Sequence, residues 1–177
     1  MRIELAREAA TVIMLGTTAW LAARNFKGRF AYFLIAFGVW DIFYYVFLAP
    51  MSGWPRSPLD WDVLFLIPLP WWGPVLAPVL IAALMVVCGT IITQLGKAEA
   101  ALWPRPVWWG VSLAGAVLAL YVFMADALHA PEWSEETLMN ILPVAFNWPL
   151  FCVALILMSA PIVDMCRKRG PDLNKGN

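Results

Sequence analysis

The 177-residue chain is 62% apolar and only 14% charged, with a mean hydropathy of +0.73. A chain of this length cannot bury so much apolar surface, so the composition excludes an ordinary soluble domain and predicts an integral membrane protein in a lipid bilayer. Twelve basic and twelve acidic residues cancel. This neutral balance predicts no nucleic-acid partner.

Five segments are apolar over the length needed to cross about 30 Å of hydrocarbon, roughly 20 helical residues. The sequence therefore predicts an all-α fold, a polytopic membrane helix bundle of five transmembrane helices. Residues 1–169 form its single domain and residues 170–177 a loose tail. The predicted spans cover residues 5–23, 30–50, 75–95, 107–127 and 148–166.

The first predicted span is the weakest of the five. Its uncharged part covers only residues 9–23, and the preceding turn contains Glu4, Arg7 and Glu8. The leading segment mixes acids with bases, and no small-residue cleavage site follows the apolar part, which is atypical of a signal peptide. We expect the segment to be retained as a membrane helix.

The second span contains an acid, Asp41, close to its midpoint. A carboxyl group at that depth costs about 2.5–3.5 kcal/mol on insertion scales. We therefore expect Asp41 to face the bundle or a partner chain, not lipid, and to hydrogen-bond with a hydroxyl group, an indole or water. This role is either structural or that of a proton, ion or ligand site. The candidate site residues are Asp41, Tyr44 and Tyr45, and hydroxyl groups are expected from Thr17, Thr18, Thr90 and Thr93.

The loop after the second span contains helix-start signals. Ser57 is a typical cap, Pro58 fits the first helical position, and Asp60 and Asp62 fall in the first turn, where carboxylates favour the helix dipole. Pro68 and Pro70 limit this element to a length too short to span. We predict a short interfacial helix in this outer loop.

The loop between the fourth and fifth spans has a similar pattern, with Ser134 as a cap and Pro143 as a stop. It predicts a second interfacial helix. Asp126 and His129 lie three residues apart before it, and with Glu132 they form a candidate metal site, because a histidine with carboxylates binds zinc, manganese or iron. The alternative is that these polar residues mark where the span leaves the membrane. Asn147 is expected to cap the fifth span.

The basic residues indicate the orientation. With the N-terminus outside, the inner side carries nine Lys and Arg residues and the outer side three, Arg2, Arg7 and Arg56. The positive-inside rule then predicts a cytoplasmic C-terminus, in a membrane of the bacterial inner type. The nine inner residues are Arg24, Lys27, Arg29, Lys97, Arg105, Arg167, Lys168, Arg169 and Lys175.

Three functional hypotheses follow from these patterns. The chain has one histidine and no glycine-rich phosphate loop or hydrolase signature, so the sequence identifies no catalytic residue and no cofactor. The first hypothesis is a non-catalytic accessory or scaffold subunit that binds other membrane chains or its own copies. The second is a receptor or carrier for a hydrophobic ligand or proton that uses Asp41. The third is a membrane enzyme or metal-binding protein that uses the outer Asp, His and Glu residues. The 11 tryptophans are explained by interfacial belts or by a ligand cage.

Overall fold

The computed structural model describes residues 2–65, 71–94, 103–128 and 145–173. These residues are mostly helical and contain one two-stranded sheet. The helices are α1 (Arg2–Ala22), α2 (Phe26–Ser52), α3 (Leu76–Gln94), α4 (Pro106–Leu128), α6 (Trp148–Met158) and α7 (Ala160–Leu173), and the strands are β1 (Trp61–Phe65) and β2 (Trp71–Pro74).

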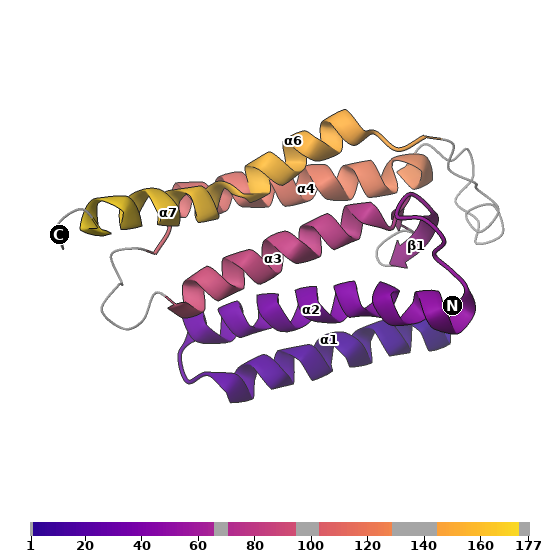
Figure 1. Ribbon diagram of the computed structural model, residues 1–177, viewed down its shortest axis with the longest axis horizontal. Coiled ribbons are helices and arrows are strands. Elements are labelled where there is room, and N and C mark those ends of the chain that lie inside the picture. Colours follow the sequence, from indigo (N-terminus) through magenta and orange to yellow (C-terminus); the bar gives the residue numbers. More distant parts are fainter. Residues whose placement is uncertain (1, 66–70, 95–102, 129–144, 174–177) are drawn as a thin grey trace.

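Four helical segments are long and apolar enough to cross a membrane: Phe26–Ser52, Leu76–Gln94, Pro106–Leu128 and Trp148–Lys168. They coincide with the second to fifth predicted spans, which are therefore helices of the required length and apolarity. The first prediction is confirmed as a helix, α1, which packs against α2 (Figure 1), but not as a span. α7 continues to Leu173, past residue 170, where we expected the tail to begin.

The helices form two layers, with α1, α2 and α3 in one and α4, α6 and α7 in the other (Figure 1). α2 and α3 approach closely because glycines lie at their contact. A Cβ atom at Gly38 would lie 2.5 Å from the carbonyl oxygen of Ala82, and one at Gly89 would lie 2.5 Å from that of Ala31. Small residues at such contacts let membrane helices pack by van der Waals contact.

The helix that forms the fifth span is interrupted at Ser159, between α6 and α7. Asn147 caps α6 as expected, because its Oδ1 accepts the Leu150 N–H at 3.1 Å. Pro161 has no N–H to continue the helical ladder. The Ser112 hydroxyl of α4 donates to the Met158 carbonyl at 3.1 Å, so a neighbouring helix pairs a backbone group at the break.

The predicted interfacial helix after Ser57 is wrong, because the chain forms a β-hairpin there. β1 pairs antiparallel with β2, with Trp61 opposite Pro74 and Asp62 opposite Gly73. The capping contacts do form: Leu59 N–H donates to Ser57 Oγ at 3.1 Å, and Ser57 N–H to Asp60 Oδ2 at 3.2 Å. They close a single turn, after which the alternating aromatic and β-branched residues extend and pair with β2.

The second predicted interfacial helix, with Ser134 and Pro143, lies outside the described residues. The described chain resumes at residue 145. Phe146 and Trp148 then pack beside Phe123 and Phe151 at the same end of the molecule as the hairpin. An aromatic cluster therefore closes the α4–α6 layer next to β1 and β2.

Candidate functional site

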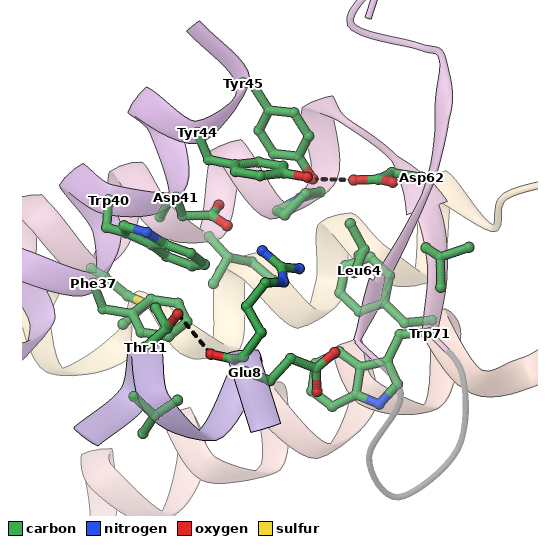
Figure 2. Close-up of a pocket in the computed structure, with 18 residues that line it drawn as sticks. Glu8, Thr11, Phe37, Trp40, Asp41, Tyr44, Tyr45, Asp62, Leu64 and Trp71 are labelled. Atoms are coloured by element: carbon green, nitrogen blue, oxygen red, sulfur yellow. Dashed lines mark hydrogen bonds between the residues drawn. The ribbon is translucent and has the colours of Figure 1, made fainter. Parts of the chain in front are cut away.

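A cavity of about 150 Å³ lies at the end of the bundle that contains the hairpin. It is lined by residues of α1, α2, α3 and both strands, and by one residue of α4, Phe123. Figure 2 shows Phe37, Trp40 and Asp41 on one side and Leu64 and Trp71 on the other. The polar residues that line the cavity are Arg7, Glu8, Thr11, Asp41, Tyr44, Tyr45 and Asp62.

Asp41 lies on α2 and lines this cavity, with its carboxyl group directed toward the other lining side chains (Figure 2). No residue in the described ranges gives this carboxyl group a hydrogen bond or an ion pair. Three of the four expected threonine partners bond within their own helices instead. Thr17 donates to Ile13 O, Thr18 to Met14 O and Thr93 to Thr90 O, at 2.8–2.9 Å. Asp41 is thus available to a molecule in the cavity.

Tyr45, the second candidate residue, is 7% exposed and donates its hydroxyl proton to Asp62 Oδ2 at 2.9 Å. This bond connects the membrane helix α2 with strand β1 (Figure 2). Sequence reasoning placed Asp62 in the first turn of a helix, whereas the structure places it in the cavity wall. The strand-favouring residues Trp61, Val63 and Phe65, which occupy every second position, were the signal that could have identified a strand.

The Asp62 side chain, on strand β1 of the hairpin, faces Tyr45 of α2 and is partly buried there. Burial raises the pKa of Asp62 above its ordinary value, because water no longer solvates the charged form. Hydrogen bonds from the Tyr45 hydroxyl and the Val63 N–H lower the pKa in part, because both stabilise the carboxylate. Two donors therefore already occupy part of the accepting capacity of Asp62.

The third candidate, Tyr44, belongs to a row of aromatic rings along α2. The Phe37 and Trp40 rings are 5.8 Å apart, those of Trp40 and Tyr44 6.1 Å, and those of Tyr44 and Tyr45 5.1 Å. All four residues line the cavity. On the hairpin side, Trp71 stacks on Phe123 at 6.3 Å with an interplanar angle of 8°. The cavity is therefore polar at its carboxyl groups and aromatic around them.

The charged residues that weakened the first predicted span belong to this site. Glu8 is only 8% exposed, and it and Arg7 line the cavity from α1. Sequence reasoning did not connect them with Asp41, because nothing in the spacing shows that α1 places them at the level of Asp41 and Asp62. Their unusual position within an otherwise apolar segment was the available signal.

The candidate metal residues are not brought together in the described part of the chain. Asp126 is exposed in the last turn of α4, and His129 and Glu132 lie outside the described residues. Among the described residues, no three His, Cys, Asp or Glu side chains form a group that could hold a metal ion. The metal hypothesis therefore stays a prediction.

Comparison with known proteins gives no match, whether with family models, curated proteins or solved structures. The cavity itself indicates what the protein can bind. Its carboxyl groups can accept hydrogen bonds or balance a positive charge, and its aromatic rings can contact an apolar body. Such a site is suited to holding a small amphipathic molecule.

Proposed function

We propose that this membrane protein is a receptor or carrier that binds a small amphipathic molecule in the cavity beside Asp41. The observation that carries the proposal is the Asp41 carboxyl group, which opens into an aromatic cavity and has no partner among the described residues. A polar group in such a position costs free energy unless something pairs with it. A bound molecule supplies that pairing.

The hairpin supports the same proposal. Concave sites with a few convergent polar groups in a mostly apolar lining are typical of small-molecule binding. Here the hairpin, three helices and Phe123 of α4 contribute to one lining, so the site exists only in the assembled fold. Because each element contributes only a few lining residues, a single substitution can change the binding of a molecule in the cavity without disrupting a helix.

The topology forms part of the proposal. We infer that α1 crosses the membrane with the other four segments, that the N-terminus lies outside, and that α7 ends in the cytoplasm of a bacterial-type cell. The excess of basic residues at the α7 end supports this orientation. In this arrangement the cavity lies toward the outer face, accessible to molecules from outside the cell or from the outer leaflet.

The test is native mass spectrometry of the full chain, purified in a mild detergent. We expect a bound small molecule in the wild-type protein and its loss from Asp41→Asn. The matched control is Asp126→Asn, because Asp126 is exposed and does not line the cavity. A wild-type protein that carries no small molecule under any purification condition would contradict the proposal.

The accessory-subunit hypothesis is the second candidate, and one face of α4 favours it. Gly110 and Ala114 lie four residues apart on this exposed face, where a Cβ at Gly110 would meet no atom within 4 Å, and Leu113 beside them is 66% exposed. Small residues at this spacing are typical of helix–helix contacts in membranes. The same native mass measurement would show a partner chain or a second copy, and Gly110→Leu should remove it.

A further inference from the structure

The cavity has an excess of acidic groups. Three carboxyl groups, from Glu8, Asp41 and Asp62, line it together with one guanidinium group, that of Arg7. Arg7 is more than a third exposed, whereas Glu8 is 8% exposed. An anionic ligand would meet these acids at short range, and the low dielectric of the site would strengthen the repulsion. The charge balance favours a cation.

The hydrogen-bonding pattern agrees with this charge balance. Asp62 already accepts from the Tyr45 hydroxyl and from Val63 N–H, while Asp41 accepts from no described residue. A carboxylate accepts hydrogen bonds and has no proton to donate. The ligand atom that faces Asp41 is therefore a hydrogen-bond donor. A positively charged nitrogen with N–H groups supplies both this donor and the positive charge that the acidic lining favours.

The aromatic row on α2 provides the second element of cation recognition. Trp40 and Tyr44 line the cavity on either side of Asp41 in the sequence. The faces of tryptophan and tyrosine rings attract ammonium groups, most strongly where water is excluded. A carboxylate with two such rings is thus suited to an ammonium group, whereas a neutral alcohol would gain little from the rings.

The volume limits the size of the ligand. A cavity of about 150 Å³ is comparable to one that holds benzene in another protein. The enclosed part of the ligand is therefore about one six-membered ring with a short chain. Ile81, Met85 and Leu64 supply apolar contacts for that part.

We propose that the ligand is an organic monocation of the arylalkylamine class, an inference that rests on the proposed function. In this arrangement its ammonium group hydrogen-bonds with Asp41 beside Trp40 and Tyr44, and its ring occupies the apolar part of the cavity. This class is narrower than the amphipathic molecule inferred above, and it makes Asp41 the residue that distinguishes amines from neutral molecules.

The experiment is calorimetric titration of the full chain in lipid nanodiscs with 2-phenylethylamine and its neutral analogue 2-phenylethanol. We expect the amine to bind at least about tenfold more tightly than the alcohol, as a charged hydrogen bond implies. Asp41→Asn should lose at least about tenfold in amine affinity and keep its alcohol affinity, while Asp126→Asn should bind both as the wild type does.

Several outcomes would overturn the amine assignment. Equal or tighter binding of the alcohol by the wild type, or unchanged amine affinity in a folded Asp41→Asn protein, would leave a cavity that binds neutral molecules, so the proposed function would stand without its ligand class. Failure of the wild type to bind the amine also overturns the assignment. Native mass spectrometry then decides separately whether the cavity holds any molecule. If Asp41→Asn does not fold, the wild-type ratio of the two affinities decides.

Discussion

The Tyr45 hydroxyl donates to Asp62 Oδ2 at 2.9 Å, across 17 positions of sequence. Tyr45 belongs to α2 and Asp62 to β1, so this bond joins the hairpin to the membrane helix that carries Asp41. Both residues also line the cavity. The bond therefore links two parts of the cavity wall, one on α2 and one on β1.

Removing the hydroxyl group with Tyr45→Phe should loosen the hairpin while the ring stays in place. Hydrogen bonds to charged groups contribute about 1.5–3 kcal/mol. We expect the backbone amides of Trp61–Phe65 to exchange with deuterium at least about tenfold faster, as measured by hydrogen-exchange mass spectrometry of the protein in nanodiscs.

The matched control is Tyr121→Phe. Tyr121 is 45% exposed on α4 and does not line the cavity, so its hydroxyl group should have no effect on β1. If both variants leave the exchange of Trp61–Phe65 unchanged, the Tyr45–Asp62 bond does not hold the hairpin.

The pH dependence of stability should reveal the buried carboxyl group of Asp62. Because its pKa is raised above the ordinary value of 3.8, the folded protein binds this proton more tightly than the unfolded chain does. The resulting stabilisation is complete below 3.8 and is lost as the pH rises through the folded pKa. Thermal unfolding in detergent should therefore occur at lower temperature as the pH rises over this range.

Asp62→Asn removes the titrating group and keeps an oxygen that can accept the Tyr45 hydroxyl proton. Its unfolding temperature should decrease less steeply with pH than that of the wild type. Parallel curves for the two proteins would show that Asp62 titrates equally in the folded and unfolded states.

Hydropathy and capping signals predicted most of the helices but not the site. Span lengths depend on long apolar runs, which a single sequence displays directly, and Asn147 caps α6 because its amide lies just before that run. Asp41 was identified as a candidate because an acid in such a run is costly wherever the helix packs. Tyr44 and Tyr45 were named with it because they follow on the same helix. Its neighbours from other elements, such as Glu8 and Asp62, were not identified, because they depend on which elements lie side by side.

The hairpin shows why local signals were insufficient. Ser57 and Asp60 make the side-chain contacts of a capping box, yet the chain extends after one turn. Pairing of β1 with β2 and the bond from Tyr45 join residues that lie further apart in the sequence than one helical turn. They outweigh the modest preference that a cap gives to a helix.

Close packing of α2 and α3 gives a prediction about glycine. A Cβ at Gly38 would lie 2.5 Å from the Ala82 carbonyl and 2.8 Å from a Val86 methyl group, so Gly38→Ala should push the helices apart and destabilise the protein by about 1–3 kcal/mol. Gly16→Ala is the matched control, because no atom lies within 4 Å of its Cβ position. Thermal unfolding of both variants would measure the difference, and equal stability would contradict the close approach of α2 and α3.

The membrane topology of α1 can be tested by labelling single cysteines with an impermeant maleimide in intact cells, after replacing Cys88, Cys152 and Cys166. α1 has 21 residues, or about 32 Å at the helical rise, which is long enough to cross. Its charges at Arg7 and Glu8 lie near its start, where the cavity and the hairpin provide polar surroundings. Crossing of α1 is therefore compatible with these charged residues.

We expect a cysteine added before Met1 and one at Ser52→Cys to be labelled from outside, and Arg24→Cys to be labelled only after permeabilisation. Ser52 and Arg24 are both exposed, at the end of α2 and just after α1, so a label can reach either. If the added cysteine and Arg24→Cys are protected together, α1 does not cross the membrane. The outer face would then begin with α2, while the cavity would still lie on the side of Ser52, because α2 carries Asp41 and Tyr45 toward that end.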